Sequence, residues 1–142
     1  PEVLRHVDVL TPNETELRIL QGLDPTDPTP TLELAERLRA EGVGTVVVTM
    51  GSSGVLVLDG EREAQQIPGV PIDVVDTTGA GDAFNAGLAT ALAEGRSLLD
   101  AARFGVCCGA LACTQLGVIP GLPMRAQADE LYASEFLRRS DR

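Results

Sequence analysis

A turn of small residues beside a carboxylate is the part of this sequence best suited to chemistry. Residues 76–88 read Asp-Thr-Thr-Gly-Ala-Gly-Asp-Ala-Phe-Asn-Ala-Gly-Leu. An apolar residue at every fourth position from Phe84 to Leu92 predicts a helix after the turn, running to about Gly95. The first N–H groups of a helix lack internal partners and carry the positive end of its dipole. The turn is therefore suited to hold a phosphate or another anion.

Asp82 is the candidate catalytic residue of this turn. It would lie in the first turn of the helix, within reach of an anion bound by the amides of Gly79, Ala80 and Gly81. A carboxylate so placed can take a proton from an attacking hydroxyl while the amides stabilise a transferring phosphoryl group. Spacing alone leaves a structural alternative open, and favours it: Asp82 complements the helix dipole and the glycines shape a turn.

Two common glycine motifs do not fit the turn. The dinucleotide-binding fingerprint requires a third glycine, whereas Gly81 is followed by Asp-Ala-Phe. A P-loop requires lysine after its last glycine, and the chain contains no lysine.

Composition and charge exclude several functional classes. The net charge is −10, and without a basic stripe the chain does not resemble a nucleic-acid binder. Charged residues or glycine interrupt every apolar run, so we expect no membrane span. An anionic substrate is not excluded, because backbone amides and metal ions can hold phosphates. The three cysteines lie in one apolar stretch without metal-site spacing, which predicts buried free thiols in a reducing cytoplasm: Cys107, Cys108 and Cys113.

Strands and helices alternate along the chain, which predicts a layered α/β fold with a mostly parallel sheet. The length is that of one domain. The predicted strands are 7–10, 45–49, 55–58 and 64–67. Two helices are predicted before the glycine turn: one over 14–21, and one that contains Leu34 and Leu38 and stops at Gly42. After the helix that follows the turn, we predict a buried helix over 98–116 and a final helix over 126–138. A rigid loop around Pro120 and Pro123 separates these last two helices.

Residues 76–88 resemble the C-terminal signature of the ribokinase/phosphofructokinase-B family of sugar kinases, whose pattern is D-T-x-G-A-G-D-x-F. The match is unbroken and specific. The resemblance implies that Asp82 deprotonates a sugar hydroxyl. It also implies that Gly79, Ala80 and Gly81 form an anion hole for the γ-phosphoryl group of ATP.

Residues 11–16 (Thr-Pro-Asn-Glu-Thr-Glu) resemble the N-x-x-E element of the same family. The resemblance implies that Asn13 contacts the nucleotide and that Glu16 belongs to a Mg²⁺ and phosphate network. An acidic side chain at a helix start can hold hydrated Mg²⁺ through waters. A capping arrangement between Asn13 and Glu16 explains the same residues equally well, and the two roles are compatible.

Two further segments match the family in the expected order. Residues 49–54 resemble its nucleotide loop, which implies nucleotide contacts from Thr49, Gly51, Ser52 and Gly54; a plain turn between strands is the alternative. Residues 117–123 resemble its tail loop, near the adenine and a monovalent-cation site. The positions that match cation ligands are Asp76, Thr78 (by its carbonyl), Ala112, Gln115 and Gly117.

The resemblance implies a ribokinase-like three-layer αβα sandwich with a mostly parallel central sheet. Residues 1–142 would be the C-terminal ATP-binding and catalytic portion of the kinase domain. The N-terminal half and the β-lid of the family have no counterpart here, so we expect weak or no activity from this chain alone. We expect a cytoplasmic protein that binds a sugar and ATP with Mg²⁺, with K⁺ and a homodimeric full-length form as further candidates.

The expected reaction is ATP-dependent phosphorylation of a sugar hydroxyl. The tail loop and residues 11–16 are more similar to ribokinases than to other members, which favours ribose. Kinases for 2-keto-3-deoxygluconate, fructose, tagatose 6-phosphate or nucleosides share the signature and stay open. From another class, a nucleotide-binding fragment without catalysis also stays open, although the presence of Asp82 argues against it.

Overall fold

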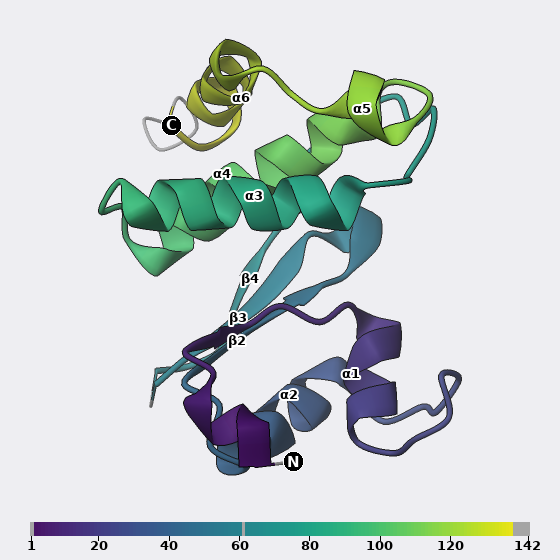
Figure 1. Ribbon diagram of the computed structural model, residues 1–142, viewed down its shortest axis with the longest axis vertical. Helices are drawn as coiled ribbons and strands as arrows, with labels where there is room; N and C mark the ends of the chain where they lie inside the picture. Colours follow the sequence, from purple (N-terminus) through teal and green to yellow (C-terminus); the bar gives the residue numbers. More distant parts are fainter. Residues whose placement is uncertain (1, 61, 138–142) are drawn as a thin grey trace. The chain divides into compact units, whose positions relative to one another are not determined.

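The computed structural model describes residues 2–60 and 62–137 (Figure 1). The chain folds into two compact units, the first reaching to Pro68 and the second beginning at Gly69. None of the helices among the described residues has the length and apolar character that a membrane span requires.

A small sheet forms the centre of the first unit. Among the described residues its strands lie in the order β1 (Val9–Leu10), β2 (Thr45–Thr49), β3 (Val55–Asp59) and β4 (Gln65–Ile67). β1 and β2 pair in parallel, whereas β2–β3 and β3–β4 are antiparallel. The expectation of a mostly parallel sheet is therefore wrong for this part of the fold. The reason is loop length, because the short connections around β3 can only reverse the chain, while two helices separate β1 from β2.

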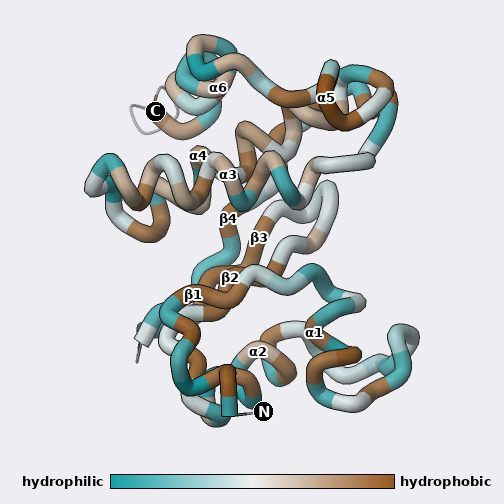
Figure 2. Tube along the Cα trace, viewed as in Figure 1, coloured by the Kyte–Doolittle hydropathy of each residue, from teal (hydrophilic) through white to brown (hydrophobic). Residues whose placement is uncertain are grey.

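Helices α1 (Glu14–Leu20) and α2 (Thr31–Ala40) follow β1 and pack with the sheet. Their apolar residues form one buried cluster with β2 and β3, and η1 (Glu2–His6) adds Leu4 to it. Figure 2 shows the apolar run along β2 and β3. Val46, Val47 and Val48 are all fully buried, although successive side chains of a strand point to opposite faces. β2 is therefore covered on both faces, which suits its β-branched residues.

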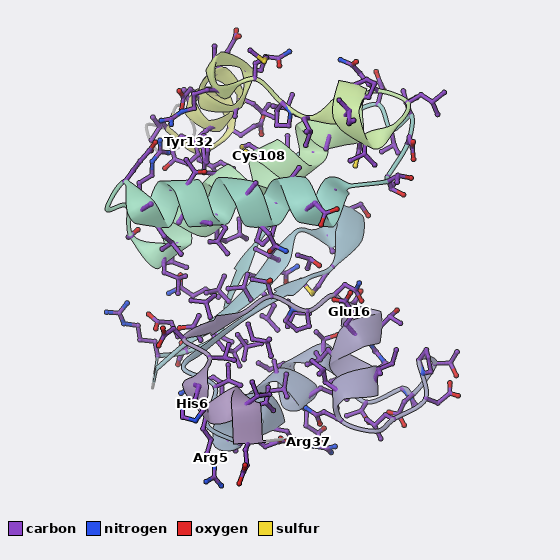
Figure 3. The ribbon with its side chains drawn as sticks, viewed as in Figure 1. Arg5, His6, Glu16, Arg37, Cys108 and Tyr132 are labelled. Atoms are coloured by element: carbon purple, nitrogen blue, oxygen red, sulfur yellow. The ribbon has the colours of Figure 1, made fainter. Side chains whose placement is uncertain are left out.

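The second unit is built on α3 (Ala80–Ala93) and α4 (Leu98–Ala112), which pack along each other (Figure 1). Small residues let the helices approach closely. A Cβ added to Gly87 would lie 2.7 Å from Cys108 Sγ, and one added to Gly105 would lie 2.9 Å from the Phe84 ring. Cys108 lies in this helix pair (Figure 3). All the cysteines are buried and free, as predicted.

The structure corrects the end of α4 and the loop that follows it. α4 ends at Ala112 and not at residue 116, because the Thr114 hydroxyl donates to the Leu111 carbonyl and the Cys113 carbonyl accepts from Val75 and Asp76. The expected rigid loop contains a one-turn helix, α5 (Val118–Gly121), in which proline occupies the first turn, where it is tolerated.

The final helix follows the predicted range as far as the structure describes it, but its type changes along its length. α6 runs over Arg125–Tyr132 and continues as a π-helical turn, η3, over Ala133–Leu137. The expected end at Arg138 lies outside the described residues. The Arg96 guanidinium lies over both Phe104 of α4 and Tyr132 of α6, 4.6 and 5.3 Å from the two ring centroids. This stacking holds α6 to the α3–α4 pair.

The contact between α3 and α4 predicts that Gly105→Ala destabilises the protein. Two ring carbons of Phe84 would lie 2.9 Å from the new Cβ, and the Phe84 carbonyl oxygen 3.0 Å. We expect the free energy of unfolding to fall by about 1–3 kcal/mol, because overpacking exceeds the gain in helix propensity. Urea denaturation measures it. The matched control is Gly81→Ala, where the added Cβ meets no atom within 4 Å and stability should hold or rise. Equal effects of both substitutions would contradict the close contact.

The buried thiols should react only after unfolding. Burial raises the pKa of Cys107 to about 12 and that of Cys108 to about 11. The reactive thiolate form therefore stays scarce until the pH approaches those values. Maleimide labelling of the native protein at about pH 8 should be slow. Labelling should complete in urea. An added cysteine at the exposed position Ala126 (A126C) is the control and should label quickly. Rapid labelling of the native wild-type protein would argue against these buried thiols.

Candidate active site

The Asp76 carboxylate organises the turn before α3. Its Oδ1 accepts from the Thr78 N–H and hydroxyl at 2.9 and 2.7 Å, and its Oδ2 accepts from the Gly117 N–H at 2.9 Å. These bonds hold the pKa of Asp76 below its usual range, with the Thr78 hydroxyl as the largest cause. One ionised side chain thus shapes the turn and ties it to a residue 41 positions further along the chain.

Gly79 changes the chain direction at the start of α3. It has φ 83° and ψ 0°, in the left-handed region that only glycine adopts without strain. Its carbonyl accepts the N–H of Ala83 at 2.9 Å, which begins the helix. A Cβ at this position would lie 2.9 Å from Cγ1 of Val118. Both the backbone conformation and the space available therefore require glycine here.

Unpaired amides surround the first turn of α3. Among the described residues, the N–H groups of Gly79, Gly81 and Asp82 donate no hydrogen bond. The Ala80 N–H donates to the Thr77 carbonyl at 3.2 Å. Of the three amides predicted to form the anion hole, that of Ala80 is therefore already hydrogen-bonded within the protein. Gly81 is exposed, with open space where a side chain would stand. An anion that binds here would complete the hydrogen bonding of a positive helix end.

The Asp82 side chain is exposed beside these amides, and the structure gives it no hydrogen bond or ion pair within the described ranges. It does not point into the core, where its neighbours Ala83 and Phe84 are buried. A carboxylate with all its lone pairs available to a ligand suits a general base.

In the first unit, Asn13 and Glu16 form a reciprocal cap on α1. The Glu16 N–H donates to Asn13 Oδ1 at 2.8 Å, and the Asn13 N–H donates to Glu16 Oε2 at 2.9 Å. The capping interpretation is therefore confirmed. Figure 3 shows Glu16 at the amino-terminal end of this helix. The predicted nucleotide and Mg²⁺ roles require that these exposed groups also serve a ligand, and they stay predictions.

Thr49 lies beside Asn13 at the carboxyl edge of the parallel strands. Thr49 and Asn13 form a parallel bridge, and the Thr49 N–H donates to the Pro12 carbonyl at 3.0 Å. Ligands of α/β sheets bind at this kind of edge. The turn η2 (Gly51–Ser53) follows, with Gly51 at φ 54° and Gly54 at φ 89°. Gly51 and Ser52 are exposed, as is Ser53, whereas Gly54 is buried, so two of the three nucleotide contacts predicted in this loop are accessible.

The predicted cation ligands are only partly gathered. Asp76, Thr78 and Gly117 are joined by hydrogen bonds. Ala112 is buried at the end of α4, with its carbonyl oxygen 2.6 Å from where a Cβ of Gly121 would be. Gln115 is exposed and has no bond to the others among the described residues. Carboxylate and carbonyl oxygens of this kind suit a monovalent cation.

A protein-only metal cage is not present in the part of the chain that the structure describes, where no group of three or more His, Cys, Asp or Glu side chains could hold a metal ion. Glu16 has one carboxylate oxygen outside its cap. A single oxygen fits Mg²⁺, which keeps several waters and binds substrate phosphates.

The structure thus assembles two clusters of predicted residues, one in each unit. The first contains Asn13, Glu16, Thr49 and the loop to Gly54, and the second contains residues 76–82 with Gly117. Sequence analysis placed Val118 in the segment that resembles the tail loop but gave its side chain no role, and the structure shows that it contacts Gly79. The apolar side chain carries no local signal of this distant partner.

Known proteins are similar to this chain in both sequence and fold. A family model described as pfkB family carbohydrate kinase matches residues 1–125. The ribokinase of Haemophilus influenzae is 37% identical over 129 residues, which cover 91% of this chain and 42% of that protein.

Two solved structures show the fold. The Arabidopsis thaliana ribokinase complexed with ribose and ATP has a TM-score of 0.84 at 35% identity, over 92% of this chain and 42% of that one. The phosphofructokinase-2 from Escherichia coli in complex with potassium has a TM-score of 0.78 at 30% identity, over 89% of this chain and 40% of that one. The chain therefore has the expected ribokinase-like α/β fold and spans less than half the length of these relatives. It belongs to the pfkB family of carbohydrate kinases.

Proposed function

We propose that residues 1–142 are the C-terminal ATP-binding and catalytic portion of a sugar kinase domain that transfers the γ-phosphoryl group of ATP to a sugar hydroxyl. The observation that carries the proposal is the pairing of unengaged amides at Gly79 and Gly81 with the exposed, unpartnered carboxylate of Asp82. Phosphoryl transfer needs this combination, because the amides stabilise charge on the phosphoryl oxygens and the carboxylate activates the acceptor.

In the proposed reaction Asp82 accepts the proton of the sugar hydroxyl. The resulting oxygen forms a bond to the γ-phosphorus while the bond from that phosphorus to the β,γ-bridging oxygen breaks, which gives a sugar phosphate and ADP. The amides of Gly79 and Gly81, at the positive end of α3, stabilise the transferring group. Mg²⁺, when bound, would neutralise phosphate charge, with Glu16 holding it through water.

The cluster in the first unit is the proposed nucleotide side. Asn13 and Thr49 offer polar groups at the carboxyl edge of β1 and β2, and the exposed residues Gly51 and Ser52 allow backbone approach. Gly54 supports the turn from a buried position. A K⁺ ion would bind near Asp76, Thr78 and Gly117, which hydrogen bonds hold together. Ala112 is a weaker candidate ligand.

Ribose is the proposed substrate, supported by the similarity to ribokinases. Other carbohydrate kinases, including those for 2-keto-3-deoxygluconate, fructose or nucleosides, are the alternative within the family. Three free, buried cysteines support a reducing compartment, and we propose the cytoplasm.

Asp82→Asn should abolish turnover and leave ATP affinity nearly unchanged. In the natural full-length protein we expect kcat to fall by about 10²–10⁴-fold, because the amide of asparagine cannot accept the hydroxyl proton. Coupled detection of sugar-dependent ADP formation measures kcat, and calorimetry measures ATP binding. Glu130→Gln removes another exposed carboxylate of the second unit and serves as the control. A kcat for Asp82→Asn within a few-fold of wild type would show that another group is the base.

Gly81→Leu should block the phosphoryl pocket without unfolding the protein. The position is open, with no atom within 4 Å of an added Cβ, and leucine is a good helix former. We therefore expect an unchanged or higher melting temperature and a loss of turnover that Gly81→Ala shows only weakly. Thermal denaturation and the same ADP assay measure the two effects. Full activity of Gly81→Leu would place the transferring group elsewhere.

A further inference from the structure

We infer that Val118 is a positioning residue for phosphoryl transfer, with its branched side chain holding Gly79 in place at the start of α3. The inference rests on the proposed function, since it assigns Val118 to the same site. Val118 lies in α5, within residues 117–123 and well after the glycine turn in the sequence, and the resemblance assigns its side chain no role.

Gly79 has no side chain with which to anchor itself, so neighbouring groups must set its position. Both methyl groups of Val118 lie against it: a Cβ at Gly79 would be 2.9 Å from Cγ1 and 3.4 Å from Cγ2. Val118 thus occupies the space that a side chain of residue 79 would need. Because the left-handed conformation of Gly79 directs the unpaired amides of α3, a shift at Gly79 moves the amides as well.

Val118 is itself fixed from two sides. The residue before it, Gly117, donates its N–H to Asp76 Oδ2 at 2.9 Å, and Asp76 in turn binds Thr78. At the other end of α5, Gly121 packs directly on the Ala112 carbonyl of α4, since an added Cβ would lie 2.6 Å from that oxygen. The end of α4, the turn of α5 and the glycine turn therefore form one connected support, with Val118 as its apolar contact.

The contribution of Val118 should appear in catalysis more than in stability. Its side chain is only partly buried, with 39% of the residue exposed, so truncation removes little apolar burial. The next residue, Ile119, is 82% exposed and provides a matched control in the same helical turn. Misplacing reacting groups by about 1 Å can cost about 100-fold in rate, so a partial shift should cost about tenfold.

The test compares three variants of the natural full-length protein: Val118→Ala, Val118→Thr and Ile119→Ala. We expect Val118→Ala to lower kcat about tenfold while KM for ATP changes less than about twofold, because the displaced amides act on the transition state. Val118→Thr keeps two γ atoms on the β-carbon and should restore activity. Ile119→Ala should match wild type. A kcat within about twofold for Val118→Ala, or an equal loss for Ile119→Ala, would overturn the inference.

A second readout separates this inference from the proposed function. Wild-type protein that forms no ADP with any sugar would refute the proposed function, and the positioning of Gly79 would then be judged by amide NMR. Val118→Ala should shift the ¹H–¹⁵N signals of Gly79, Gly81 and Asp82, whereas Ile119→Ala should leave them in place. Unchanged signals in Val118→Ala would refute the positioning role whether or not the protein is active.

Discussion

The left-handed turn at Gly79 is the constraint on which the candidate site depends. It directs the chain into α3 and leaves the N–H groups of Gly79, Gly81 and Asp82 without acceptors. A buried interior would make such unpaired donors costly, but Gly81 and Asp82 are exposed and Gly79 is only half-buried, at the positive end of a helix where an anion can satisfy them. The arrangement is therefore stable without a ligand and ready to bind one.

Tertiary contacts keep this turn rigid. Asp76 accepts three hydrogen bonds, two from Thr78 and one from Gly117, and Val118 packs on Gly79. Rigidity matters because amides that are already oriented need no reorganisation when charge develops on the transferring group. The close packing of α3 on α4, made possible by glycines such as Gly105, fixes the helix whose first turn carries Asp82.

The Asn13–Glu16 pair shows how a structural role and a binding role can share the same residues. Each side chain satisfies a backbone N–H of the other, which stabilises the start of α1. Glu16 still has a second carboxylate oxygen, and Asn13 lies next to Thr49 at the carboxyl edge of two parallel strands. Capping thus orients the groups that we propose as the nucleotide side, so the two interpretations of the sequence support each other.

Local sequence determined the elements whose signals are local. The β-branched run of β2, the apolar spacing of α3 and the cap of α1 all appear where they were predicted, because backbone propensity and burial act over a few residues. The signature around Asp82 likewise identified the family.

Only the tertiary structure decided the antiparallel pairing of β3, the early end of α4 at Ala112 and the contact of Val118 with Gly79. Each of these depends on groups distant in sequence, such as the Cys113 carbonyl that binds Val75 and Asp76, and no local pattern encodes which distant partner a residue will meet.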